Sequence, residues 1–205
     1  MMKRCLIIGN GPSLNDIPDK FLDMYPTFGS NRVYLRFDPI YYACVNPLVI
    51  QQYSYEIAQM QSVKFIRASL SDMVPNSIKL HSISKSVFSY EPLKYIYEGY
   101  TVTYVLMQIA YSMNYDEVGL VGVDHRYIFD GRPNQKLIAT EKDPNHFDPS
   151  YFADGSAWNA PDLVKSEESY YLARAAYEMD GRRIVNLTPG SALDVFDREE
   201  WQSWM

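Results

Sequence analysis

The feature that most constrains this chain is a short apolar run close behind the N-terminus that ends in two glycines. Residues 5–14 read Cys-Leu-Ile-Ile-Gly-Asn-Gly-Pro-Ser-Leu. A short, β-branched run of this kind is typical of a strand buried on both faces, as in a parallel sheet. Gly9 and Gly11 permit a tight turn in which a ligand can approach the backbone. Ser13 is expected to cap a short helix that begins near Leu14.

A strand, a glycine turn and a helix N-terminus in this order form a ready anion site, because the first N–H groups of a helix have no partner within it. We interpret the turn as a nucleotide-phosphate loop; an ordinary turn that binds nothing is the alternative. No Gly-Lys-Ser/Thr follows, which excludes a Walker A loop. Leu14 stands where a dinucleotide fingerprint has its third glycine. The next strand ends in Asn31 instead of an acidic residue, which argues against NAD.

Apolar runs and helical periodicity alternate along the rest of the chain, and this alternation predicts an α/β fold. We expect a single Rossmann-like nucleotide-binding domain over residues 1–205, with a mainly parallel central sheet and helices on both faces. Residues 69–99 are expected to be irregular with a small hairpin. In the last helix, Tyr171 and Met179 are expected to point inward. Strands are predicted at residues 26–31, 41–45, 63–67, 117–123 and 183–187, and helices at 48–59, 101–114 and 166–180.

Polar residues follow several of the predicted strands. Asn10, Asn31 and Asn46 each come directly after an apolar run. In open α/β sheets, ligands bind at the carboxyl ends of the strands. Asparagine is also common in turns, so one such residue is a weak signal. Together, the three predict a polar, uncharged pocket.

Two further pairs of residues are candidates for the same pocket. Thr101 and Thr103 stand at the start of a predicted helix, where they either cap it or face the ligand. Asp124 and Tyr127 follow the strand at 117–123, again at a carboxyl end.

Residues 130–161 form a long polar stretch without periodicity. Loops of this length in compact domains are usually functional or disordered, and the aromatic residues here argue against disorder. We expect a lid that is mobile without ligand and ordered by it, with Tyr151, Phe152 and Trp158 packed over the site. A permanently ordered loop that forms a subunit contact is the alternative.

His146 lies in this stretch and is the candidate general base. His81 resembles a surface residue, and His125 follows a strand end, where it is expected to shape the pocket or to hydrogen-bond locally. An ordinary imidazole titrates at about pH 6.5 and is largely neutral at cytoplasmic pH, so it can take a proton. Asp143 or Asp148 could orient it. The alternative is that His146 only pins the loop through hydrogen bonds.

Composition limits the remaining classes. The 205 residues, 47% of them hydrophobic and 21% charged, suit one globular domain. A net charge of −6 without a basic cluster argues against a nucleic-acid partner. The first apolar run is too short for a membrane span or a signal peptide, and Cys5 and Cys44 resemble core residues of a reducing compartment. A cytoplasmic location is therefore expected. Several of the 18 tyrosines could line a subunit interface, so a homo-oligomer is one option.

Several of these segments resemble known proteins. Residues 7–14, 30–31 and 45–47 resemble the opening of the small bacterial sialyltransferases that use CMP-sialic acid, glycosyltransferase family 42. Residues 102–124 and 127–130 are similar to the same family. A wider resemblance is to the DUF115 group, which includes MptE-like (6-hydroxymethylpterin diphosphokinase-like) proteins. Residues 101–104, 122–125, 143–147 and 181–187 are closer to that branch.

The resemblance implies roles for residues at matching positions. Asn10, Ser13, Asn31 and Asn46 would hold the nucleotide and its phosphate. Tyr127 would assist the departing phosphate, and His146 would be the base. A serine of the family corresponds to Val102 here, so Thr101 or Thr103 would substitute for it. Arg126 stands near the place of a second phosphate-binding tyrosine.

Three functions are compatible with these observations. The leading one is a metal-independent glycosyltransferase that needs no cofactor. It would transfer a sialic-acid-like sugar from a CMP-activated donor to a hydroxyl of a glycan or glycolipid acceptor. The second is a Mg²⁺-dependent pyrophosphokinase acting on a hydroxymethylpterin-like substrate, with Asp124 and Asp130 as metal-binding carboxylates. The third is a nucleotide-binding protein without catalysis. The candidate catalytic residues are His146, Tyr127 and Asp124, and the candidate nucleotide-binding residues are Gly9, Asn10, Gly11, Ser13, Asn31, Asn46, Thr101 and Thr103.

Overall fold

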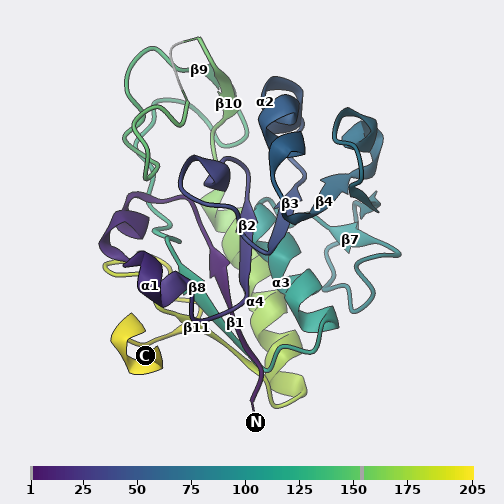
Figure 1. The fold of residues 1–205 in the computed structure, drawn as a ribbon, viewed down its shortest axis with the longest axis vertical. Coiled ribbons are helices and arrows are strands. Elements are labelled where there is room, and N and C mark those ends of the chain that lie inside the picture. Colours follow the sequence, from purple (N-terminus) through teal and green to yellow (C-terminus); the bar gives the residue numbers. More distant parts are fainter. Residues whose placement is uncertain (1, 153–154) are drawn as a thin grey trace.

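The computed structural model of the chain describes residues 2–152 and 155–205. Within these residues the central sheet has eight strands, and every neighbouring pair runs parallel (Figure 1). The predicted α/β fold with a mainly parallel sheet is thus confirmed. From one edge to the other, the strands are β12 (Asp197–Arg198), β11 (Arg183–Asn186), β8 (Glu117–Val121), β1 (Arg4–Ile8), β2 (Thr27–Ser30), β3 (Tyr41–Cys44), β4 (Val63–Arg67) and β5 (Ile78–Leu80).

Helices cover both faces of this sheet, as predicted. In β1, Cys5 and Ile7 join the core on the face of α3 and α4, while Leu6 and Ile8 join the core on the face of α1 and α2. This follows from the alternation of side chains along a strand, and all four are fully buried. No helix in the described part of the chain is long and apolar enough to cross a membrane. The helices are α1 (Asp19–Leu22), α2 (Pro47–Gln59), α3 (Val102–Ser112) and α4 (Leu163–Met179), with short 3₁₀ segments η1 (Pro12–Asp16), η2 (Val33–Leu35), η3 (Ala68–Met73) and η4 (Trp201–Trp204).

The strand order reverses direction between β1 and β8. From β1 the chain adds β2, β3, β4 and β5 on one side, and β8, β11 and β12 lie on the other. Open α/β sheets bind ligands outside the carboxyl ends of their strands at such a reversal of strand order. The register pairs Ile8 with Val121, so the loops after β1 and β8 begin at the same level of the sheet.

Two expectations about local structure are wrong. Ser13 does not cap a helix: η1 already begins at Pro12 with Gly11 as its N-cap, because proline is favoured in the first turn. The irregular stretch at 69–99 contains no hairpin in the structure. It contributes β5 to the edge of the sheet and a short parallel pair formed by β6 (Ser82–Ile83) and β7 (Ile96–Tyr97).

The buried face of α4 also differs from the prediction. Tyr171 and Met179 are 58% and 81% exposed, whereas Tyr170 and Tyr177 are buried. Neighbouring tyrosines make the two faces of this helix equally apolar in sequence. The face that is buried is the one that carries Tyr177, whose hydroxyl donates to the buried carbonyl of Met107 at 2.8 Å.

We predict that Gly9→Ala destabilises the protein by about 1–3 kcal/mol, because overpacking has costs of this order. A Cβ at Gly9 would lie 2.3 Å from the carbonyl oxygen of Gly122, a backbone atom that cannot rotate away. Urea denaturation measures the change. Gly181→Asn is the control, because Gly181 has φ +67 and no atom within 4 Å of an added Cβ, and asparagine tolerates this conformation. Equal losses for the two variants would contradict the close approach of the two strand ends.

Candidate functional site

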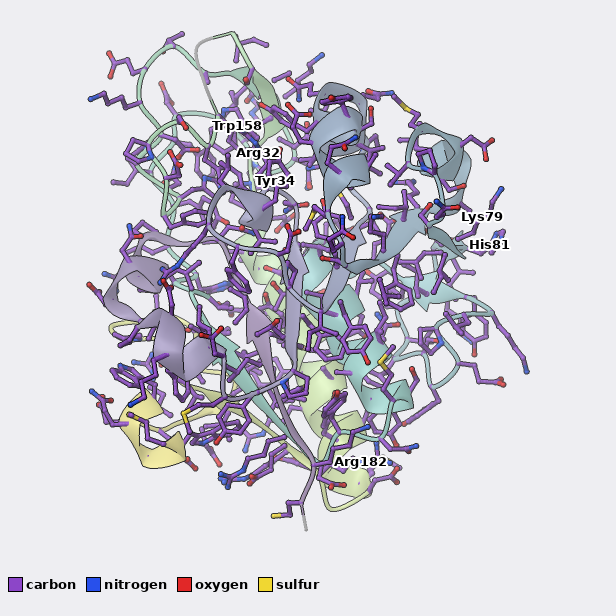
Figure 2. All side chains as sticks on the ribbon, in the orientation of Figure 1. Arg32, Tyr34, Lys79, His81, Trp158 and Arg182 are labelled. Carbon is purple, nitrogen blue, oxygen red and sulfur yellow. The ribbon has the colours of Figure 1, made fainter. Side chains whose placement is uncertain are left out.

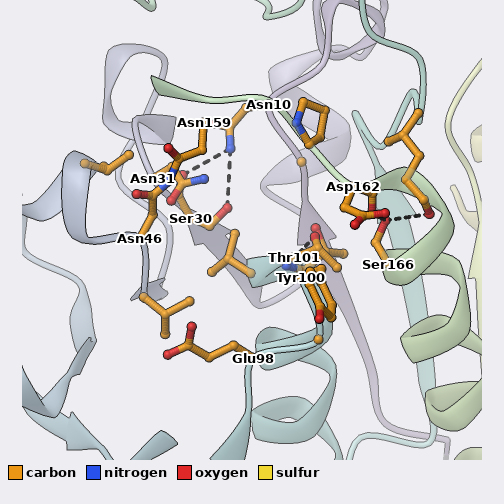
Figure 3. Close-up of a pocket in the computed structure, with 18 of the residues that line it drawn as sticks. Asn10, Ser30, Asn31, Asn46, Glu98, Tyr100, Thr101, Asn159, Asp162 and Ser166 are labelled. Atoms are coloured by element: carbon orange, nitrogen blue, oxygen red, sulfur yellow. Dashed lines mark hydrogen bonds between the residues drawn. The ribbon is translucent and has the colours of Figure 1, made fainter. Parts of the chain in front are cut away.

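A pocket of about 820 Å³ lies at the reversal of strand order (Figure 3). The carboxyl ends of β1, β2, β3 and β8 line it, together with the N-terminal ends of α3 and α4. All but one of the candidate catalytic and nucleotide-binding residues line this single pocket, and the exception is Ser13. The lining residues among those predicted are Gly9, Asn10, Gly11, Asn31, Asn46, Thr101, Thr103, Asp124, Tyr127 and His146.

The glycine turn after β1 is closed by Asp124. The Asp124 carboxylate accepts hydrogen bonds from the Ser13 N–H at 3.2 Å and from the Ser13 hydroxyl at 2.7 Å. The Gly11 N–H donates to the carbonyl of Gly122 at 2.9 Å. A Cβ at Gly11 would lie 1.9 Å from Asp124 Oδ2 and 2.9 Å from the carbonyl oxygen of Gly122, so a side chain there would displace the carboxylate. The anion at this turn is a carboxylate of the same chain, and the donors of Ser13 are engaged by it instead of facing the pocket.

The side chain of Asn10 reaches into the pocket from the same turn. Its amide nitrogen donates to the carbonyl and the hydroxyl of Ser30, at 3.2 and 3.3 Å. Among the described residues, Asn10 Oδ1 is the one buried side-chain N or O atom without a hydrogen-bond partner. A buried acceptor left unpaired costs about 1–3 kcal/mol. The site therefore favours a ligand with a hydroxyl or amino group to donate at this point.

The side-chain oxygens of Asn31 and Asn46 accept hydrogen bonds from within the protein. Asn31 has φ 51, a left-handed conformation that asparagine tolerates, and its Oδ1 accepts the thiol of Cys44 at 3.5 Å. Asn46 caps α2, since its Oδ1 accepts the Leu48 N–H at 3.0 Å. Within the described part of the chain, no group accepts a hydrogen bond from either Nδ2. The pocket thus gains two amide donors, held in place by the Cys44 thiol and the Leu48 N–H respectively.

His146 is held on two sides. Its Nδ1 lies 2.7 Å from Asp143 Oδ2, and the two side chains are only 8% and 5% exposed. The imidazole stacks on the Tyr151 ring, with centroids 3.8 Å apart and planes 2° apart. A carboxylate at Nδ1 favours the tautomer that carries its proton there, which leaves Nε2 as the basic nitrogen. Of the two aspartates proposed to orient this histidine, the structure selects Asp143; Asp148 accepts hydrogen bonds from Ser150 instead.

Tyr127 lies edge-on to His146, with ring centroids 6.0 Å apart. Burial raises the pKa of the Tyr127 phenol above its ordinary value, and the nearby Tyr170, Asp124 and Asp143 add to the effect. The phenol therefore stays protonated at neutral pH, and its hydroxyl can donate a hydrogen bond. No described residue forms a hydrogen bond with that hydroxyl, so it is available to a ligand.

The residues on the α3 and α4 side are partly engaged with one another. Thr101 caps α3 by accepting the Thr103 N–H at 3.3 Å, and its hydroxyl also lies 3.3 Å from that of Tyr170. His125 both lines the pocket and hydrogen-bonds locally, with Nε2 2.8 Å from Glu167 Oε1. Both roles considered for His125 are thus present in the structure.

The middle of the predicted lid is packed into the core. Tyr151 and Phe152 are 1% and 8% exposed and belong to the core on the face of α2. The Tyr151 hydroxyl accepts the Arg32 N–H at 3.1 Å, and the Phe147 N–H donates to the carbonyl of Asn10 at 2.9 Å. The Arg32 guanidinium, beside Tyr34 in Figure 2, also donates to the carbonyl of Ser150 at 3.1 Å. These rings therefore support the site from within instead of covering it.

Two further segments of the predicted lid, β9 (Lys136–Ile138) and β10 (Ala157–Asn159), pair as the antiparallel strands of a hairpin. Gln52 of α2 fixes it through two hydrogen bonds, from Nε2 to the Ala157 carbonyl at 2.8 Å and from the Ala157 N–H to Oε1 at 2.9 Å. Trp158 stacks on Phe152. Residues 153–154 of the predicted lid lie outside the described residues. Ligand-dependent ordering of this hairpin stays a prediction.

Some lining residues escape the sequence analysis. Arg67 ends β4, so the strand-end rule that selects the asparagines applies to it as well. Glu98 comes from the stretch expected to be irregular and Tyr100 directly follows that stretch, while Asn159 comes from the predicted lid and Asp162 directly follows it. Those four carry no periodicity or motif from which the sequence could place them.

Comparison with known proteins supports the architecture. No protein-family model and no curated protein matches the chain, which leaves the DUF115 resemblance without a matching model. Among solved structures, the chain shares the Rossmann-like fold of a class of glycosyltransferases. In particular, it is similar to the sialyltransferase CstII from Campylobacter jejuni in complex with a substrate analogue, cytidine-5'-monophosphate. The TM-score is 0.56, with 16% identity over 96% of this chain and 84% of that chain. For CstII in complex with CMP-3FNeuAc, the TM-score is 0.52, with 15% identity over 96% and 85%.

We predict that Ser13 and Asp124 are energetically coupled. Ser13→Ala and Asp124→Asn should each lower the free energy of unfolding. The double variant should lose less than the sum, with a coupling of about 1–3 kcal/mol, because one charge-assisted hydrogen bond is removed in both single variants. A double-mutant cycle by urea denaturation measures it. Additive losses would show that the carboxylate does not close the turn.

Proposed function

We propose that this protein is a glycosyltransferase that transfers an acidic sugar from a CMP-activated donor to an acceptor hydroxyl, without a metal ion. The observation that carries the proposal is the pair of Asp143 and His146, which presents a basic imidazole nitrogen in a pocket otherwise rich in uncharged amides and hydroxyls. The fold shared with CstII, a sialyltransferase solved with CMP, supports the same class of reaction.

The chemistry assigns one role to each side of the pocket. His146 Nε2 would take the proton of the acceptor hydroxyl, while Asp143 holds the ring and stabilises the imidazolium that forms. Tyr127 would donate to the phosphate oxygen that gains charge as the glycosidic bond breaks, and its protonated phenol suits that role. The amide donors of Asn31 and Asn46 would hold the nucleotide.

One observation keeps a second candidate in view. Carboxylates slightly outnumber guanidinium groups in the described pocket lining, with Glu98, Asp124 and Asp162 against Arg67 and Arg126. A polyphosphate in such surroundings needs a counter-ion, as in a Mg²⁺-dependent pyrophosphokinase.

The two carboxylates suggested for that metal are not well placed for it. Asp130 does not line the pocket, and both oxygens of Asp124 already accept hydrogen bonds from Ser13. Uncharged donors for a single phosphodiester fit the observed lining better. We therefore place the metal-independent transferase first.

A nucleotide panel separates the two candidates. Thermal shift and calorimetry with CMP, a CMP-sugar, UMP and ATP, each with Mg²⁺ and with EDTA, should show stabilisation by the cytidine ligands that EDTA leaves unchanged. Asn31→Ala should weaken CMP binding by roughly 5- to 150-fold, the equivalent of one to a few hydrogen bonds. Asn46→Ser, which keeps a capping oxygen for α2, should do the same without unfolding the helix. Stabilisation by ATP only with Mg²⁺, and none by CMP, would establish the second candidate instead.

His146→Ala should lower turnover by roughly 10²–10⁴-fold, the usual contribution of a general base, and should leave CMP affinity unchanged. Because a base acts only in its neutral form, the acidic limb of the pH–rate profile should disappear with it. Asp143→Asn should lower turnover on the order of 10²-fold, because an amide can favour the wrong tautomer. His81→Ala is the control, since His81 lies at the edge of the molecule (Figure 2). Unchanged turnover, or loss of CMP binding together with turnover, would refute the assignment.

A further inference from the structure

The pocket extends beyond the asparagines into a polar arm that the proposed roles leave unused. Residues at the end of β4 and around β6 and β7 line this arm. In Figure 3, Glu98 lies below Asn31 and Asn46, on the side of the pocket away from Asn159. The arm's polar lining residues are Arg67, Ser82, Ser84, Ser86, Tyr97 and Glu98.

The charges of this arm neutralise each other. Arg67 Nη1 lies 3.3 Å from Glu98 Oε2, and both side chains are partly open to solvent, at 31% and 27% exposed. The Ser82 hydroxyl donates to the other oxygen of Glu98 at 2.5 Å, and the Ser86 hydroxyl lies 3.2 Å from that of Tyr97. Donors and acceptors alternate along this surface without a net charge. Such a surface complements a ligand with several hydroxyl groups better than it complements an anion.

Tyr100, two residues after Glu98, lines the same pocket in an unusual conformation. Its φ is +60, a left-handed backbone that is a true outlier for a bulky side chain. Within the described chain, the other five non-glycine residues with positive φ are asparagines or a histidine, which tolerate it. The ring nevertheless lines the pocket and is 50% exposed, so it gains little burial in return for this strain.

The fold fixes this conformation through the preceding glycine. Gly99 also has a left-handed backbone, with φ +62, and a Cβ there would lie 2.4 Å from the Tyr104 ring and 2.9 Å from Ser169. The turn is therefore wedged between α3 and α4, directly before the α3 cap. Strained residues that persist beside a cleft are often functional, and the inference here starts from the observed outlier.

We propose that Tyr100 and the Arg67–Glu98 arm form the binding site for the acceptor, a neutral saccharide whose ring stacks on Tyr100 and whose hydroxyl groups bind Glu98 and the serines. An aromatic face beside paired polar groups matches the two surfaces of a sugar ring, one apolar and one hydroxylated. The open rim lets a longer acceptor continue into solvent. This inference rests on the proposed glycosyl transfer, and the test below separates the two.

The direct test measures saccharide binding without a donor. Saturation-transfer NMR with the methyl glycosides of galactose, glucose, N-acetylglucosamine and N-acetylgalactosamine should detect at least one of them on the wild-type protein. Tyr100→Ala should weaken that binding about 10-fold, the loss of one stacked aromatic contact, and Tyr100→Phe should keep it within about 2-fold. Tyr55→Ala is the control, because Tyr55 is 76% exposed on α2 and does not line the pocket.

A second variant separates binding from folding. Tyr100→Gly should raise Tm by about 2–4 °C, because glycine relieves the left-handed strain, and yet it should lose saccharide binding as Tyr100→Ala does. CMP affinity should be unchanged in both variants. The proposal is overturned if no glycoside of the panel binds, if Tyr100→Ala binds like the wild type, or if Tyr100 variants lose CMP. Glycoside binding in a protein that does not bind CMP would refute the proposed donor and leave the saccharide site standing.

Discussion

The architecture depends on the contact between the carboxyl ends of β1 and β8. These ends approach so closely that a side chain at Gly9 would meet the Gly122 carbonyl and one at Gly11 would displace the Asp124 carboxylate. A turn of this kind has an electropositive edge that must meet an anion or a dipole. The chain supplies that anion itself, from 111 residues further on. This contact between the two loops fixes the backbone from which the side chains of Asn10 and Tyr127 extend.

A satisfied glycine turn changes what the pocket can recognise. Much of the pocket lining consists of neutral groups, chiefly amide donors, hydroxyls and a protonated phenol. Neutral donors of this kind stabilise a modest, delocalised negative charge, such as one phosphodiester, better than the dense charge of a polyphosphate. Tyr151 stacks against His146 and restricts the orientation of the imidazole, which would lower the free-energy cost of positioning the proposed base.

The sequence predicts the sheet well because its strands are short, apolar and bounded by glycine or asparagine. The position of polar residues after β1, β2, β3 and β8 likewise predicts which side chains share a pocket, since parallel strands end at one edge. The sequence does not predict contacts between distant segments. Nothing near Ser13 shows that Asp124 will take its donors. Tyr170 and Tyr171 are equivalent in pattern, and only the packing against α3 decides which is buried. The sequence around Tyr151 is typical of a lid, and it does not show that the Tyr151 hydroxyl accepts the Arg32 N–H in the core.

Cys44 illustrates how far the chemistry of the site is set by its surroundings. The thiol lies against Asn31, and burial raises its pKa to about 12. At neutral pH the thiolate, the form that reacts with oxidants, disulfides and electrophiles, is then a negligible fraction. A sulfur atom in contact with an asparagine proposed to bind the nucleotide would ordinarily make a site sensitive to peroxide or to thiol reagents. Here the burial that places the thiol against Asn31 also keeps the thiolate fraction negligible, which lowers the reactivity of the sulfur towards peroxide and thiol reagents.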